Sequence, residues 1–170
     1  MRKRFLVFLV LALGVMLSGY SCEREASKTL AAGTKGASAA GVNFYYSNDA
    51  TYLVGTLETN STGWVAVGFG GSTMAETGRV VMGMVTGVTH EVEVHSIEGR
   101  SHTMVDVTLE ASGSDIGGVT TITFKIALAD LGMSGLSGKT IPIILARNAY
   151  TKNFKIYHSG QRGSSVITLN

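Results

Sequence analysis

The chain has 170 residues, of which 45% are apolar, 15% are charged and 22 are glycine, and this length suits one domain. The charged fraction is well below the usual quarter, which argues against a coiled coil or a disordered chain. The single cysteine excludes an internal disulfide framework and a thiolate-rich metal cluster. The formal charge is +2, but removing Arg2, Lys3 and Arg4 from the 14 basic residues leaves 11 against 12 acidic ones. We therefore expect no nucleic-acid partner.

The first 21 residues have the pattern of an export signal. Three basic residues precede an apolar run from Phe5 to Leu17, and small and polar residues follow it, as in a secretory signal peptide. The apolar run is shorter than the roughly 20 residues that a membrane-spanning helix needs. We therefore expect residues 1–21 to be a signal peptide and the mature protein to work outside the cytoplasm, in the periplasm or cell envelope.

Cys22 lies where a bacterial lipoprotein carries its lipidated cysteine, directly after the small residue Ser21. Such signals usually have a leucine three residues before the cysteine, and here that position is Gly19. Two outcomes stay open: a lipid on Cys22 that anchors the protein without spanning the membrane, or ordinary signal cleavage after Ser21. Residues 22–41 are small and polar with no aromatic side chain, and they predict a flexible tether.

Residues 42–170 predict an all-β domain. Apolar and polar side chains alternate over Thr103–Leu109 and over Ile122–Leu128, which is the pattern of half-buried strands. The only helical signal is a turn near Leu128 to Met133. About nine or ten strands of this kind, joined by short polar connections, predict an antiparallel β-sandwich of two packed sheets.

Two segments, Gly63–Phe69 and Ile141–Leu145, are apolar on both faces. This predicts strands in the middle of the sandwich, although Pro142 favours an edge or a bulge for the second segment. A domain of this size buries around two thirds of its unfolded surface. It can therefore fold without a metal or a disulfide, and any cofactor would serve function.

The four histidines are sorted by their parity along the expected strands. His158 shares the parity of Phe154, and His90 shares that of the neighbouring valines, so both are expected to point inward. His95 and His102 are expected to face solvent. An inward histidine can be a hydrogen-bonded core residue or a ligand, and both interpretations stay open at this point.

The methionines divide in the same way. Met82 and Met84 share the parity of Val80 and are expected to fill the sandwich core. Met74 differs, because it lies in the polar, glycine-rich connection from Gly70 to Gly78, where no periodicity requires a large apolar side chain. It can lean on the core, or it can offer its sulfur to a soft metal or to haem iron.

Conventional catalytic motifs are absent from the sequence. It contains no Gly-x-Ser-x-Gly, no His-Glu-x-x-His, no phosphate-binding Gly-x-x-x-x-Gly-Lys and no Cys-x-x-Cys-His for covalent haem attachment. No motif therefore indicates conventional catalysis, and we do not expect a stand-alone enzyme.

Two motifs at opposite ends of the domain resemble the DOMON family, which includes the cytochrome domain of cellobiose dehydrogenase. The first is Thr62-Gly-Trp-Val-Ala-Val-Gly-Phe-Gly70, followed by Met74 and by Arg79-Val-Val-Met-Gly-Met-Val85. The second is Tyr157-His-Ser-Gly-Gln-Arg-Gly163, with a final strand from Ser165 to Leu169. Trp64 and Phe69 in the first motif are expected to fill the core.

The resemblance implies a DOMON-like β-sandwich that holds a b-type haem, without covalent bonds, between a loop methionine and a histidine near the C-terminus. At the matching positions these residues are Met74 and His158. The resemblance also allows Arg162 to pair with a haem propionate, because a guanidinium binds a carboxylate through two hydrogen bonds. Two occupied axial positions favour one-electron transfer, so the implied partner is a redox protein or a membrane quinol system.

Two other functions stay open. A haem-free carbohydrate-binding module would use aromatic faces that stack on sugars, and the candidates are Tyr45, Tyr46 and Tyr52. A copper-binding module would use imidazole and thioether ligands, which Cu(I) accepts, and the candidates are His90, Met104 and His102.

Overall fold

The computed structural model describes residues 33–99, 101–158 and 161–170. The expected signal peptide, Cys22 and most of the expected tether lie outside these ranges, so export and lipidation stay predictions. Within the described ranges, no helical segment combines the length and the hydropathy of a membrane span.

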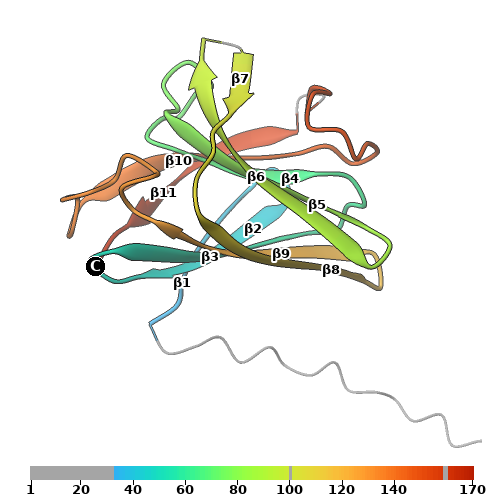
Figure 1. The fold of residues 1–170 in the computed structure, drawn as a ribbon, viewed down its shortest axis with the longest axis horizontal. Coiled ribbons are helices and arrows are strands. Elements are labelled where there is room, and N and C mark those ends of the chain that lie inside the picture. Colours follow the sequence, from blue (N-terminus) through green and yellow to red (C-terminus); the bar gives the residue numbers. More distant parts are fainter. Residues whose placement is uncertain (1–32, 100, 159–160) are drawn as a thin grey trace, which may run out of the picture. The chain divides into compact units, whose positions relative to one another are not determined.

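The described residues form eleven strands in two antiparallel sheets, which confirms the predicted all-β sandwich (Figure 1). The five-stranded sheet contains, in spatial order, β1 (Lys35–Ala39), β2 (Val42–Asn48), β3 (Tyr52–Thr59), β9 (Val119–Ala127) and β8 (Leu109–Ile116). The six-stranded sheet contains β11 (Arg162–Thr168), β10 (Thr140–Arg147), β4 (Val65–Phe69), β5 (Arg79–Thr86), β6 (Thr89–Glu98) and β7 (Ser101–Met104).

The main core lies between the two sheets and is built from alternate residues of each strand. Phe44 of β2 is at its centre, with its ring centroid 6.3 Å from that of Phe124 on β9 and 6.1 Å from that of Phe69 on β4. Gly55 of β3 makes room for these rings, because a Cβ there would lie 2.5 Å from Phe124 and 2.8 Å from Phe44. All three phenylalanines are fully buried, and they hold the sheets face to face.

The six-stranded sheet is buried on both faces around its central strand β4, all of whose residues are buried. Val65, Val67 and Phe69 belong to the core between the sheets. Ala66, on the opposite side of β4, belongs to a second apolar cluster on the sheet's outer face, the face turned away from the five-stranded sheet. This cluster consists of Trp64, Ala66, Val80, Met82 and Phe154. The prediction that Gly63–Phe69 contains a strand in the middle of the sandwich is thus confirmed, since β4 lies between β10 and β5.

The folded part begins earlier than expected. Strand β1 lies inside the segment 22–41 that was predicted to be a tether, and it pairs with β2 along its whole length. The two strands are joined by Ala40 and Gly41, whose φ angles of 54° and 73° suit a two-residue hairpin turn. Small residues with one lysine look like a linker in the sequence, but they also fit an edge strand.

Two other strand predictions are corrected. Thr103–Leu109 was expected to be one strand, but β7 ends at Met104 and β8 starts at Leu109, because the chain crosses there from one sheet to the other. Pro142 was expected to mark an edge, but β10 lies between β11 and β4. The proline is tolerated because the β10–β4 ladder starts one residue later, at Ile143 and Phe69.

Candidate cofactor site

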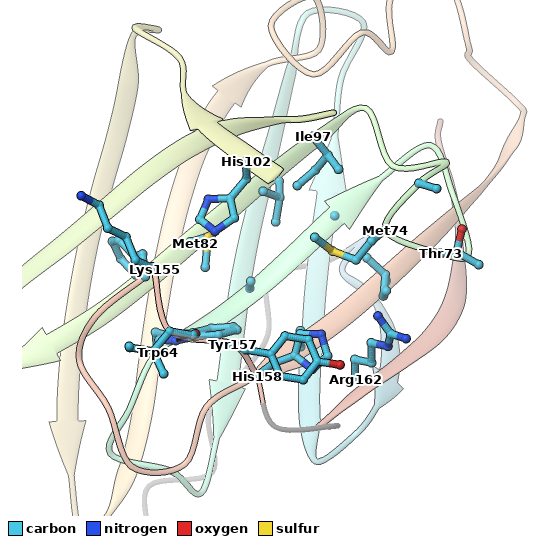
Figure 2. A pocket seen from close by; sticks show the side chains of 18 of the residues that line it. Trp64, Thr73, Met74, Met82, Ile97, His102, Lys155, Tyr157, His158 and Arg162 are labelled. Atoms are coloured by element: carbon cyan, nitrogen blue, oxygen red, sulfur yellow. Dashed lines mark hydrogen bonds between the residues drawn. The ribbon is translucent and has the colours of Figure 1, made fainter. Parts of the chain in front are cut away.

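A cavity of about 710 Å³ lies on the outer face of the six-stranded sheet (Figure 2). This volume falls within the range of about 300–1,000 Å³ that is usual for small-molecule and cofactor sites. Its floor is formed by β4 and β10, where Ala66, Gly68 and Ala146 line the cavity. Because these side chains are small or absent, they leave room above the middle of the sheet.

Met74 enters the cavity from the loop between β4 and β5. The loop is a compact turn, because the Thr73 carbonyl accepts hydrogen bonds from the backbone N of Glu76 and Thr77, at 3.2 and 3.1 Å, and from Thr77 Oγ1 at 2.8 Å. Gly71 allows the loop to close on itself, since a Cβ there would lie 2.6 Å from Thr77 N. Met74 is half-buried and lines the cavity, and it belongs to neither apolar cluster. Figure 2 shows its sulfur directed into the cavity.

The opposite wall is the loop that joins β10 to β11, and Asn148 fixes its shape. The buried Asn148 side chain accepts hydrogen bonds from the backbone N of Tyr150 and Thr151, at 3.0 and 3.1 Å, and donates one to the carbonyl of Tyr157 at 2.7 Å. Trp64 adds a hydrogen bond from Nε1 to the carbonyl of Ile156, 3.2 Å away. The segment Phe154–His158 is therefore an ordered loop, and its prediction as a strand is wrong.

His158 is the most unusual group in this wall. It is only 5% exposed, as the inward prediction required, yet neither ring nitrogen has a hydrogen-bond partner. The ring of Tyr157 packs against the imidazole, with 3.9 Å between the centroids. Burial lowers the pKa of His158, and the positive charge of Arg162 lowers it further, so the ring is neutral and keeps a free lone pair. A buried polar group without a partner points to a missing ligand or to a functional role.

Two cations line the cavity beside these groups. Arg162 is the first residue of β11, is exposed to solvent and borders the cavity, where its guanidinium can bind a carboxylate. Lys155, in the loop before His158, also borders the cavity. Lys155 was not among the predicted site residues, because a strand over Phe154–His158 would turn this side chain away from the site.

The structure thus brings Met74, His158 and Arg162 together around one cavity. Trp64 is buried in the apolar cluster on the outer face and also lines the cavity, whereas Phe69 lies in the core between the sheets. Met82 and Met84 also pack on the outer face and not between the sheets. Their parity with Val80 was assigned correctly, but both faces of this sheet are apolar.

The other histidines differ from the predictions in their burial. His90 faces β8 of the opposite sheet, as expected, since a Cβ on Gly113 would lie 2.8 Å from its Cβ, but it is exposed because it lies at the hairpin end of β6. His95 was expected to be solvated but is only 5% exposed, because Phe154 and β7 cover the outer face, with 6.3 Å between the His95 and Phe154 ring centroids. His102 is half-buried and lines the cavity. The glycine of the β6–β7 hairpin, Gly99, is the signal that could have predicted these two histidines on one face.

The three tyrosines considered for sugar binding do not all lie on one surface. Tyr46 is buried in the core, and its hydroxyl accepts a hydrogen bond from Thr168 N at 2.9 Å. Tyr52 is exposed on the outside of the five-stranded sheet beside Lys125, whose Nζ lies 4.8 Å from the ring centroid. Tyr45 is half-buried on the neighbouring strand. These positions leave no common stacking platform for the three rings.

The copper candidates are not all close together. His102 and Met104 lie two residues apart on β7, where Met104 is 61% exposed, but His90 is exposed near the hairpin that joins β5 to β6. Among residues 33–99, 101–158 and 161–170, no group of three or more His, Cys, Asp or Glu side chains could hold a metal ion.

No family model matches this sequence, and no curated protein does. Among solved structures, the fold is similar to the cytochrome b domain of pyranose dehydrogenase from Coprinopsis cinerea, with a TM-score of 0.60 and 14% identity over 74% of this chain and 75% of that one. It is equally similar to the cytochrome domain of cellobiose dehydrogenase from Myriococcum thermophilum, with a TM-score of 0.60 and 15% identity over 81% and 82% of the two chains. A family 9 carbohydrate-binding module from Caldicellulosiruptor kristjanssonii, in complex with glucose, has a TM-score of only 0.41 and 9% identity over 76% of each chain.

The resemblance inferred from the two sequence motifs is therefore confirmed at the level of the fold: the chain has the β-sandwich of these dehydrogenase cytochrome domains.

Proposed function

We propose that this chain binds a b-type haem without covalent bonds in the cavity between Met74 and His158, and that it carries single electrons. The observation that supports this most strongly is the buried imidazole of His158, which has no hydrogen-bond partner and lies in a cavity that Met74 also lines. The structural likeness to two cytochrome domains supports it independently.

The donor set suits this cofactor. A bound haem would supply reversible one-electron chemistry. Neutral His158 offers a nitrogen lone pair, and Met74 offers a thioether sulfur, a pair that favours the reduced state. Arg162 would bind a propionate carboxylate through its guanidinium. The apolar floor over Ala66 and Ala146 would exclude water from the ring.

With Met74 and His158 both holding the haem, the group would supply electron transfer, and the chain would not activate oxygen or a substrate by itself. It would instead relay electrons between other components outside the cytoplasm, in the periplasm or at the cell envelope. The partners would be a redox protein or a membrane quinol system, and a lipid on Cys22 would keep the domain near the membrane.

An absorption spectrum tests the proposal directly. The purified protein, reconstituted with haem, is expected to show a sharp Soret band and resolved α and β bands on reduction. His158→Ala is expected to lose most of the haem on gel filtration. Met74→Ala is expected to keep a weakened or high-spin haem. His90→Ala is the matched control, because this exposed histidine lies outside the cavity, and it should leave the spectrum unchanged.

A protein that stays colourless would contradict the proposal. Spectra that are unchanged in both ligand variants would show that other residues bind the iron, and His102 would then be the next to replace, because it is the other histidine that lines the cavity.

A further inference from the structure

A chain of three titratable side chains leads from the outer face of β6 into the cavity. Glu93 Oε2 lies 2.6 Å from Nε2 of His95, and Nδ1 of His95 lies 3.0 Å from Nδ1 of His102. His102 lines the cavity. Figure 2 shows it on the side where Trp64 and Lys155 lie, whereas Met74 and Arg162 lie on the other side. The proposed haem ligands do not use this chain.

The hydrogen bonds constrain which nitrogens carry protons. The Glu93 carboxylate can only accept, so Nε2 of His95 must carry a proton. A second proton must lie between Nδ1 of His95 and Nδ1 of His102, which are 3.0 Å apart, because a hydrogen bond needs one donor. The Phe154 backbone also interacts with the His102 imidazole, and the carboxylate at the far end of the chain stabilises any positive charge that His102 gains.

We propose that His102 takes up a proton from solvent when the cofactor in the cavity gains an electron, and that Glu93 and His95 hold His102 ready to do so. This inference rests on the proposed function. The electron comes from the one-electron donor that the proposed function requires, and the proton balances its charge. On oxidation, both leave again.

The charges around His102 agree with proton uptake on reduction. Burial lowers the pKa of His102 from 6.5, and His95 lowers it further, whereas Glu93 and the Phe154 backbone raise it. His102 is therefore neutral at neutral pH. An electron added to the cavity would favour the protonated form and raise this pKa. Three other cavity groups face the same space, the cations Lys155 and Arg162 and the neutral His158, and the two cations disfavour a further positive charge.

The reduction potential as a function of pH tests the proposal, measured on the haem-loaded protein between about pH 5 and 8, where histidines titrate. The potential of the wild type should rise as the pH falls, with a slope of no more than 59 mV per pH unit, the limit for one proton and one electron. His102→Gln should make the potential nearly independent of pH in this range. Glu93→Gln should move the sloping region to lower pH, because it removes the negative charge that stabilises protonated His102. His90→Gln, outside the cavity, should keep the wild-type slope.

Several results would overturn the proposal. A wild-type potential that does not change with pH would do so, and so would an unchanged slope in His102→Gln. If either result is found while the absorption spectrum is normal, the haem site is intact and only the proposal that His102 takes up a proton is wrong. Loss of the haem spectrum in His102→Gln would instead make His102 a ligand, and a colourless wild type would remove both proposals.

The haem-free protein gives a separate readout. Nitrogen-15 NMR of the imidazole rings should find a proton on Nε2 of His95 and a hydrogen bond between Nδ1 of His95 and Nδ1 of His102. The absence of this nitrogen–nitrogen hydrogen bond would break the chain and contradict the proposal.

Discussion

His158→Leu is expected to stabilise the haem-free protein, although it removes a proposed haem ligand. Both ring nitrogens of His158 are buried without a hydrogen-bond partner. A buried polar group left unsatisfied costs about 1–3 kcal/mol. Leucine has a similar size and no polar atom, so the substitution should raise the free energy of unfolding by about 1–3 kcal/mol.

His95→Leu is the matched control. His95 is as buried as His158, each being 5% exposed, but its two ring nitrogens are bonded to Glu93 and His102. Replacing it leaves those two groups without their partner. The free energy of unfolding should therefore fall, by about 1–3 kcal/mol. The same substitution at two equally buried histidines is thus expected to have opposite effects.

Urea unfolding followed by the fluorescence of the single tryptophan measures both effects. Trp64 is 3% exposed and lies at the cavity, so its emission reports on this region. The measurement belongs at about pH 8, above the usual histidine pKa of about 6.5, so that protonation of His158, whose pKa is lowered by burial, does not contribute. If His158→Leu destabilises the haem-free protein as much as His95→Leu does, then His158 has an unseen partner and the reasoning about its unsatisfied nitrogens is wrong.

Three further outcomes are expected. The haem-free protein should lose stability as the pH falls below 6.5. In the folded state the pKa values of His158 and His102 are lowered from 6.5, so the unfolded chain binds more protons below that pH. Urea midpoints that stay constant down to about pH 5 would contradict this. Asn148→Ala removes three side-chain hydrogen bonds and should lower the free energy of unfolding by about 1–3 kcal/mol. It should also speed the transfer of haem to apomyoglobin. An unchanged transfer rate would show that the loop does not need these hydrogen bonds. Arg162→Gln should speed haem loss without changing the positions of the absorption bands, and a changed spectrum would mean that Arg162 affects the iron ligands.

The sequence predicted the architecture because alternation with a period of two reports directly on half-buried strands. It also separated Met74 from the core, since a polar glycine-rich loop gives no packing reason for a methionine. The burial of His158 was predicted correctly, but from a strand that does not exist. The position of this residue depends on the loop that Asn148 and Trp64 hold, and these contacts join residues far apart in the chain.

Parity could not predict how the outer face of the six-stranded sheet is covered. His95 points away from the sandwich core, as its alternation with the valines requires, but Phe154 lies over it. Its hydrogen bond to His102 depends on the register of β6 against β7, in which His95 pairs with Met104 and Ile97 pairs with His102. The alternation within one strand does not report the register between two strands, so the two histidines were predicted to be solvated, and only the hairpin glycine Gly99 indicated that they could meet.

A crystal structure of the protein after reconstitution with haem tests the central proposal most directly. We expect the haem to lie in the cavity on the outer face of the six-stranded sheet, with its iron bonded to the sulfur of Met74 and to an imidazole nitrogen of His158. A cavity without haem, or iron bonded to any other pair of side chains, would contradict the proposed electron-transfer site.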